Sequence, residues 1–138
     1  MAKLRIVVVI IRNNQGQYFV HQRRLDKESC PDGYALGIGG RIEQDEDIHT
    51  AAKRELKEES GIVKPVKFLF SLDMNYIGMD EIIHVFYLSN DAEIKNHDIE
   101  WQWSGWMTQK EVDELVENGK LCPDTAEYYT KYKSKYER

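Results

Sequence analysis

The sequence predicts an α/β (α+β) fold, an α/β/α sandwich in which helices cover both faces of a mixed β-sheet. Two observations lead to this prediction. The first is the order of the expected elements, which are strands, one long amphipathic helix, further strands and two C-terminal helices. The second is the segment Leu4–Ile11, whose β-branched apolar residues show no alternation, as expected of a central strand covered on both faces.

Length and charge limit the class of protein. The chain has 138 residues, enough for a single domain over residues 1–138 with a core of its own. A formal net charge of -5, from 19 basic and 24 acidic residues, argues against general affinity for nucleic acid or an anionic membrane. No apolar run approaches the ~20 residues of a membrane span, and the N-terminus lacks a signal-peptide pattern. We therefore expect a cytoplasmic protein with no nucleic-acid or membrane partner.

The chain has two cysteines, Cys30 and Cys122. They are too few and too far apart in sequence for a zinc motif. In a reducing compartment, reduced and partly buried thiols without a functional role are the expectation.

Two short strands are expected between the first strand and the helix. Tyr18–Arg24 predicts the second strand of a hairpin. The loop Asp26–Gly33 separates it from the short strand Tyr34–Ile38, which leads to the glycine pair Gly39-Gly40. Glycine at this point permits the backbone to approach a ligand closely.

The long helix is expected to begin near Asp45–Asp47 and to end before a left-handed cap at Gly61. At ~100° per residue, Glu55 and Glu59 fall on the face of the apolar stripe, and Glu58 lies at its flank. Such carboxylates repel one another, and a hard divalent cation would remove that cost. The alternative is that these glutamates are ordinary solvated helix charges.

Beyond the helix, Val66–Tyr76 and Ile82–Leu88 predict an antiparallel pair of strands joined by a turn at Gly78. The polar segment Ser89–Ile99 is expected to be a loop, where substrate choice usually resides. A last strand is expected from Glu100 to Trp106.

The C-terminal part is rich in aromatic residues. Trp101 and Trp103 are expected on one face of the last strand, either as core residues or as a stacking platform for a nucleobase. A capping box at Thr108 predicts a helix over Gln109–Asn118, and Pro123 starts the final helix. The tyrosines of that helix recur every four residues and are expected to pack onto the sheet or to form a dimer contact. They are Tyr128, Tyr132 and Tyr136.

The glycine pair and the helix carry a spaced motif, Gly-x5-Glu-x7-Arg-Glu-apolar-x-Glu-Glu-x-Gly-apolar. Its nine fixed positions make the match highly specific. They are filled by Gly40, Glu46, Arg54, Glu55, Leu56, Glu58, Glu59, Gly61 and Ile62. The pattern resembles the Nudix box, the signature of hydrolases that act on nucleoside diphosphates linked to another group. The sequence departs from the common form of the Nudix box at Asp45, where a glycine often precedes the first glutamate. This residue lies in a turn and is not a ligand, so the difference concerns the shape of the loop more than the chemistry.

The resemblance implies a Nudix-type α/β/α sandwich and a metal-dependent pyrophosphohydrolase. Its substrate would be a nucleoside diphosphate derivative or a nucleoside triphosphate, cleaved at a diphosphate linkage with Mg²⁺, or Mn²⁺ as a substitute. The metal ligands implied are Glu55, Glu58, Glu59 and a backbone carbonyl of the glycine pair, assigned to Gly39. Arg54 would orient Glu55.

The resemblance also implies a further carboxylate near the last strand. Glu100 is assigned as a catalytic residue, with Asp98 as its competitor for the role of base or additional ligand. Basic residues near the motif are assigned to the substrate's phosphates, with a solvated strand end as the alternative. These are Arg23, Arg24, Lys27 and Arg41.

The stretch before the motif is similar to the branch that contains isopentenyl diphosphate isomerase and its hydrolase relatives. Isomerase chemistry is disfavoured because Gly39 stands where its catalytic cysteine would be. A domain of this family that binds nucleotide without turnover is the other alternative. Homodimers are common in the family, so a homodimer is a further expectation.

Overall fold

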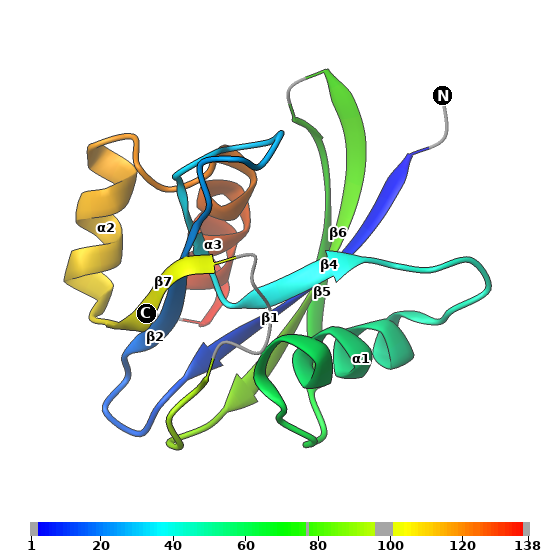
Figure 1. Cartoon of the computed structure of the whole chain (residues 1–138), viewed down its shortest axis with the longest axis horizontal. Coiled ribbons are helices and arrows are strands. Elements are labelled where there is room, and N and C mark those ends of the chain that lie inside the picture. Colours follow the sequence, from blue (N-terminus) through cyan, green and yellow to red (C-terminus); the bar gives the residue numbers. More distant parts are fainter. Residues whose placement is uncertain (1–2, 77, 96–100, 137–138) are drawn as a thin grey trace.

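The computed structural model describes residues 3–76, 78–95 and 101–136. Within these ranges seven strands form one mixed sheet, and helices lie on both of its faces (Figure 1). The strands are β1 (Leu4–Arg12), β2 (Tyr18–Arg23), β3 (Tyr34–Leu36), β4 (Ile38–Arg41), β5 (Lys67–Tyr76), β6 (Met79–Ser89) and β7 (Trp101–Met107), and the helices are α1 (Ile48–Ser60), α2 (Gln109–Glu117) and α3 (Pro123–Tyr136). None of the helices in these ranges is long and apolar enough to cross a membrane.

Strand β1 lies at the centre of the sheet. It pairs in parallel with β6 along its whole length and antiparallel with β2 and β4. The strand order is β3-β2-β1-β6-β5, with β4 added to β1 and β7 added to β2. The predicted mixed sheet and fold class are therefore confirmed.

The absence of alternation in β1 follows from its two buried faces. Val7, Val9 and Ile11 belong to the core cluster that includes Ala51, Ala52 and Leu56 of α1. Val8 and Ile10 belong to the second cluster, which includes tyrosines of α3. Burial on both faces leaves no position where a polar side chain would be favourable.

The aromatic stripe of α3 packs onto the sheet, as predicted. Tyr128 and Tyr132 are buried, and Tyr136 is partly exposed and stacks on Tyr132 with a centroid distance of 5.3 Å. The preceding helix α2 begins with the predicted capping box, in which Thr108 and Glu111 exchange side-chain and backbone hydrogen bonds.

The expected strand Tyr34–Ile38 is divided in the structure into β3 and β4. Gly37 causes the break, because its φ is +79° and a Cβ there would lie 2.1 Å from the carbonyl oxygen of Val9. The chain leaves β2 at this glycine and pairs with β1 instead. This exchange brings the glycine pair of β4 next to α1.

The predicted limits of α1 are close to those observed. Asp47 caps the N-terminus by accepting a hydrogen bond from the Thr50 amide at 2.8 Å, and Gly61 caps the C-terminus with φ of 77°. Asp45, which replaces a common glycine, has φ of 66°. Aspartate tolerates this left-handed conformation better than most residues other than glycine, so it can occupy a position where glycine is common.

The prediction that Trp101 and Trp103 share a face is wrong. The pairing of β2 with β7 shifts register between Gln22 and Arg23, and a bulge of this kind reverses the alternation of side chains. Trp101 therefore stacks on His21 in the core on the α1 side, whereas Trp103 is 41% exposed.

The prediction of two reduced thiols is also wrong. Cys30 and Cys122 form a disulfide with a Cα–Cα distance of 5.9 Å across 92 positions of sequence. The fold brings the loop between β2 and β3 against the start of α3, and sequence spacing contains no information about this long-range contact.

Candidate active site

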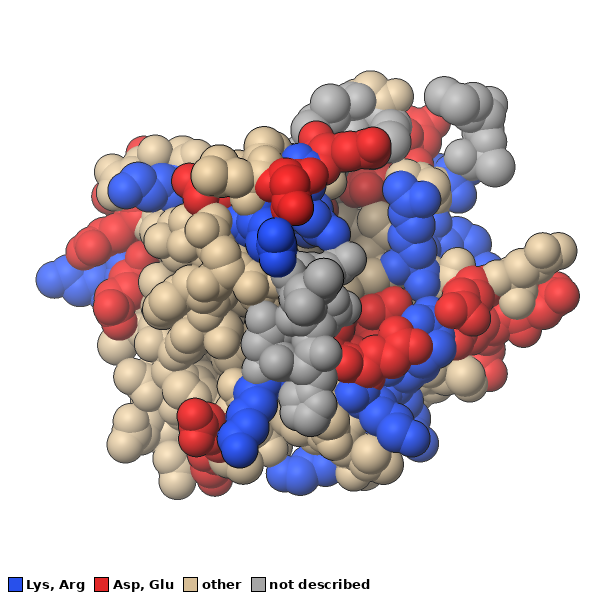
Figure 2. Space-filling model, in the orientation of Figure 1, with Lys and Arg blue, Asp and Glu red and all other residues tan. Residues whose placement is uncertain are grey.

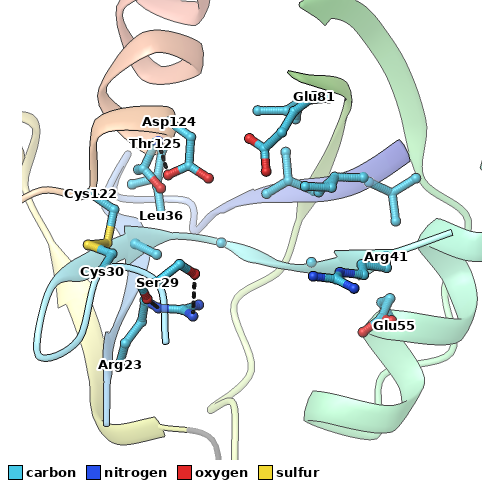
Figure 3. Close-up of a pocket in the computed structure, with 18 of the residues that line it drawn as sticks. Arg23, Ser29, Cys30, Leu36, Arg41, Glu55, Glu81, Cys122, Asp124 and Thr125 are labelled. Atoms are coloured by element: carbon cyan, nitrogen blue, oxygen red, sulfur yellow. Dashed lines mark hydrogen bonds between the residues drawn. A yellow bond between two sulfur atoms is a disulfide. The ribbon is translucent and has the colours of Figure 1, made fainter. Parts of the chain in front are cut away.

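A pocket of about 680 Å³ runs from α1 and β4 across β1 to the start of α3. Figure 3 shows Glu55 and Arg41 on one side of it and Asp124 and Thr125 on the other. The part of the lining contributed by the sheet is largely apolar and includes Ile6, Val8, Leu36 and Ile83. The pocket therefore combines two polar ends with an apolar floor.

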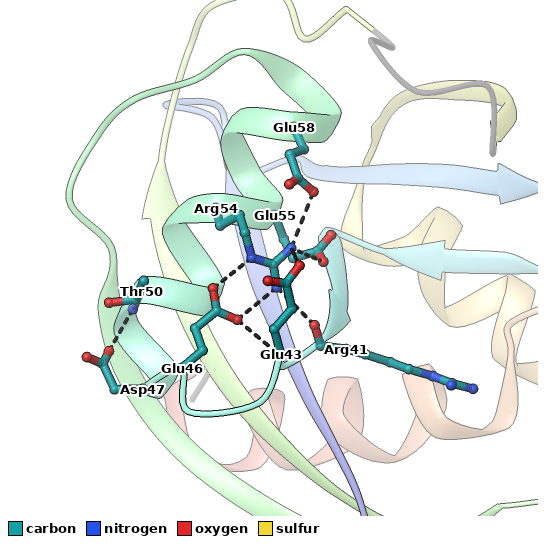
Figure 4. A network of polar contacts seen from close by, with 8 residues as sticks. All are labelled: Arg41, Glu43, Glu46, Asp47, Thr50, Arg54, Glu55 and Glu58. Carbon is teal, nitrogen blue, oxygen red and sulfur yellow. Dashed lines mark hydrogen bonds and ion pairs between the residues drawn. The ribbon is translucent and has the colours of Figure 1, made fainter.

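Arg54 lies at the centre of a network of carboxylates beside this pocket (Figure 4). Its guanidinium donates two hydrogen bonds to Glu46, at 2.7 and 2.9 Å, and one to Glu55 at 2.9 Å. It also donates to Glu58 at 3.3 Å and to the backbone carbonyl of Arg41 at 3.0 Å. The Arg54 side chain is only 20% exposed, so it is a structural part of the motif rather than a surface cation.

The pairing of Arg54 with Glu46 stabilises the charged form of both groups. Hydrogen bonds from Arg54 lower the pKa of Glu46 to about 2. The hydrogen bond with Glu46 also raises the pKa of Arg54 above its ordinary value. Because Arg54 joins helix α1 to the loop before it and to the end of β4, the network holds the Glu55 carboxylate in place.

The three glutamates predicted as metal ligands do not lie in equivalent positions. Glu55 and Glu58 line the pocket. Their side chains are 13% and 56% exposed. Glu59 is buried, with 4% of its surface exposed, and it lies outside the pocket lining. The structure therefore brings two of the three carboxylates together at the pocket.

The glycine pair lies directly against these glutamates. Gly39 and Gly40 line the pocket and pair with Val8 and Val7 of β1. A Cβ at Gly40 would lie 2.5 Å from the carboxyl carbon of Glu55. Glycine at this position therefore allows the Glu55 carboxylate to reach the strand.

The predicted substrate-binding cations divide into two groups. Arg23, Lys27 and Arg41 line the pocket, whereas Arg24 lies outside it and pairs with Asp26. Arg23 donates a hydrogen bond to the Ser29 carbonyl at 3.0 Å and so holds the loop that carries Lys27. Figure 2 shows acidic and basic side chains next to one another on this face of the molecule, which suits a ligand that brings both negative charge and a metal.

Glu100 and Asp98 lie outside the described residues. Two carboxylates that the sequence analysis did not consider line the far part of the pocket, Glu81 of β6 and Asp124 of α3. Glu81 precedes the buried residues Ile83 and Val85 by two and four positions, so its side chain lies on the same face of β6. This two-residue spacing is the feature of the sequence that indicates an inward-facing Glu81.

Comparison with known protein families identifies the fold and its motif. The NUDIX domain model matches residues 2–132. The chain belongs to the Nudix family. Its Nudix box consists of the nine motif residues from Gly40 to Ile62, and it occupies β4, the loop after it and α1.

Similar proteins include Nudix hydrolases and structures with the same fold. The nucleoside triphosphatase NudI of an Enterobacter species is 32% identical over 127 residues, which cover 83% of this chain and 89% of that protein. The crystal structure of DR0079 from Deinococcus radiodurans matches with a TM-score of 0.82 at 23% identity, over 93% of this chain and 82% of that one. The family match and the likeness to NudI indicate an enzyme that acts on phosphoric anhydride bonds. The narrower resemblance to the isomerase branch is not confirmed.

A third match is a bifunctional NMN adenylyltransferase/ADP ribose pyrophosphatase from Francisella tularensis, whose structure was solved with AMP and a manganese ion. Its TM-score is 0.76 at 21% identity, over 97% of this chain and 42% of that chain. At this identity the match concerns the fold.

The donor set of the Nudix box fits a hard divalent cation. Glu55 and Glu58 offer only oxygen ligands, and Mg²⁺ is usually held by one or two carboxylates together with water and substrate phosphate. Among the described residues, no three His, Cys, Asp or Glu side chains form a preassembled cluster for a metal.

Replacing Gly40 by alanine tests the contact between β4 and the Nudix box helix. Gly40 does not have a positive φ, so Ala fits the backbone, but its methyl group displaces the Glu55 carboxylate. We expect Gly40→Ala to lower kcat/KM by about 100-fold, since a shift of about 1 Å at a catalytic group costs that much. The melting temperature should change little, because the displaced group is the end of a flexible side chain. Full activity in this variant would contradict the role of Glu55.

Proposed function

We propose that this Nudix domain is a divalent-metal-dependent pyrophosphohydrolase that cleaves the diphosphate linkage of a nucleoside triphosphate or a nucleoside diphosphate derivative. The observation that carries the proposal is the placement of Glu55 and Glu58 at one end of a pocket that also contains Arg23, Lys27 and Arg41. An enzyme that cleaves a diphosphate needs carboxylates to hold a divalent cation and basic side chains to bind the phosphate oxygens.

In this proposal Glu55, Glu58 and the Gly39 carbonyl would hold Mg²⁺ at the pocket, with Mn²⁺ as a substitute. Glu59, the third predicted ligand, is buried outside the pocket lining. When bound, the cation neutralises phosphate charge and lowers the pKa of a bound water. A relative at 32% identity bears the name nucleoside triphosphatase, and a protein with this fold was solved with AMP and manganese. Both support a nucleotide substrate.

The chain's own residues then have separate roles. Arg54 holds the Glu55 carboxylate in place through the 2.9 Å hydrogen bond. Arg41 of β4, Arg23 at the end of β2 and Lys27 of the loop after β2 bind phosphate oxygens. The proton taken from water goes to a carboxylate, for which Glu100, Asp98 and a glutamate of the Nudix box are the candidates.

A panel of diphosphates tests this function. Phosphate or nucleotide products should be released from at least one of the nucleoside triphosphates, dinucleoside polyphosphates, ADP-ribose or nucleotide sugars in the presence of Mg²⁺ or Mn²⁺. Excess EDTA should lower the rate at least about 100-fold, because the metal supplies several kcal/mol of transition-state stabilisation. Isopentenyl diphosphate should give neither hydrolysis nor isomerisation. Tight nucleotide binding without any product would instead identify a binding domain.

A further inference from the structure

Glu81 is a buried carboxylate that the proposed hydrolysis does not use. It lies near the start of β6 and pairs in parallel with Leu4 of β1. Only 4% of its surface is exposed, and within the described parts of the chain its Oε1 atom has no hydrogen-bond partner. Burial of a polar atom without a hydrogen-bond partner is unfavourable, so its presence in a pocket points to a ligand group that supplies the missing partner.

A second carboxylate faces the same part of the pocket. Asp124, in the first turn of α3, accepts a hydrogen bond from the Thr125 amide at 2.8 Å. Figure 3 shows the carboxyl groups of Glu81 and Asp124 both turned into the pocket. They project from the α3 side, whereas Glu55 and Glu58 project from α1. With the phosphates at the Glu55 end, as the proposed function has them, this pair lies at the end left for the group attached to the diphosphate.

Burial and neighbouring charges shift the pKa of both carboxyl groups. Burial, and then the negative charge of Asp124, raise the pKa of Glu81 to about 7, and Arg41 of β4 opposes this shift. Burial also raises the pKa of Asp124, against the nearby charge of Arg23. Near neutral pH Glu81 is therefore only partly protonated. The two carboxyl groups together have four oxygen atoms, and a proton on Glu81 turns one of these acceptors into a donor.

An acceptor-rich pair of this kind distinguishes between nitrogen and oxygen substituents. An amino group donates hydrogen bonds to carboxylate oxygens. A carbonyl oxygen in the same place is itself an acceptor and is repelled by them. The neighbouring floor of Val8, Leu36 and Ile83 is apolar and suits the face of a flat ring. A planar group with N–H donors on its edge satisfies both surfaces.

We propose that Glu81 and Asp124 bind the edge of an amino-bearing nucleobase and make the enzyme prefer such nucleotides over their oxo or deamino counterparts. The inference rests on the proposed function, because the phosphates place the base at this end of the pocket. Both residues are specificity-determining groups, and neither takes part in the transfer of the phosphoryl group.

Two matched pairs of nucleotides test the preference. CTP and UTP differ at the amino-bearing edge of one ring, and GTP and ITP differ by one amino group. Affinity is measured by titration calorimetry in EDTA, where no turnover occurs, and kcat/KM is measured separately with Mg²⁺. The variants are Glu81→Gln and Asp124→Asn. Glu127→Gln is the matched control, because Glu127 is exposed on the same helix and lies outside the pocket lining.

The wild type should bind at least one amino member about tenfold or more tightly than its partner, since a hydrogen bond to a charged group contributes about 1.5–3 kcal/mol. Glu81→Gln and Asp124→Asn should bring that ratio close to one, whereas Glu127→Gln should leave it unchanged. The binding ratio supports the inference even where no hydrolysis occurs, so a failure of the proposed function is recognised separately.

Three results would overturn the inference. The first is a wild-type ratio near one for both pairs or no measurable binding of any of the four nucleotides. The second is a ratio that Glu81→Gln and Asp124→Asn leave unchanged. The third is an equal loss of kcat for all four nucleotides in Glu81→Gln without any change in the binding ratio, which would identify a general base instead.

Discussion

Glu58→Gln is expected to lower kcat by two or more orders of magnitude while the protein stays folded. Glu58 lines the pocket beside Glu55 and is one of the proposed metal ligands. Loss of its charge weakens the hold on a cation that contributes several kcal/mol to the transition state. The Glu58 side chain is 56% exposed, and its carboxylate lies 3.3 Å from the Arg54 guanidinium. An exposed ion pair of this kind contributes only about 0.3–0.5 kcal/mol to the free energy of unfolding. Activity and folding should therefore separate in this variant.

Steady-state kinetics at several Mg²⁺ concentrations and thermal unfolding measure the two effects. Glu43→Gln is a matched control, because Glu43 also approaches Arg54, at 3.7 Å, but is 69% exposed and lies outside the pocket lining. It should change kcat by no more than a few-fold. Wild-type turnover in Glu58→Gln would remove Glu58 from the metal site.

The parts of the fold that depend on local pattern could be predicted from the sequence. The uniform apolar run of β1, the caps at Asp47 and Gly61 and the capping box at Thr108 each contain their own structural signal. The errors arose where an element depends on its neighbour. The division at Gly37 requires the carbonyl of Val9. The faces of the tryptophans depend on a bulge that only the pairing of β2 with β7 creates.

The candidate site shows the same division. Fixed spacing was sufficient to find the Nudix box, because Arg54, Glu55 and Glu58 lie on one helix. Glu81 and Asp124 come from a strand and a helix that are far apart in sequence, and only the topology brings them to one pocket. Arg24 was assigned to the substrate on sequence proximity, but it lies outside that pocket.

Removal of the disulfide is expected to have the largest effect on stability. Cys30 and Cys122 close a loop across 92 positions, and a loop of this length restricts the unfolded chain by about 4–5 kcal/mol in the chain-entropy model. The total stability of a domain is only about 5–15 kcal/mol. Cys30→Ala/Cys122→Ala should therefore unfold at a much lower guanidinium concentration. The m-value of its unfolding transition should be larger than that of the oxidised wild type, because the unlinked unfolded chain exposes more surface.

Reductant provides the control for this prediction. It should lower the unfolding midpoint of the wild type towards that of the double variant and leave the variant's midpoint unchanged. Equal midpoints for oxidised wild type and double variant would contradict the stabilising role of the disulfide.

The native contacts at the disulfide explain why its loss should act through the unfolded chain. Backbone hydrogen bonds from Tyr34 to the Lys120 carbonyl, at 2.9 Å, and from Cys122 to the Tyr34 carbonyl, at 2.8 Å, hold the same region. The folded structure therefore persists locally without the bond. Because the bond also holds the loop that carries Lys27, and not the glutamates of α1, KM for a nucleotide should rise more than kcat falls.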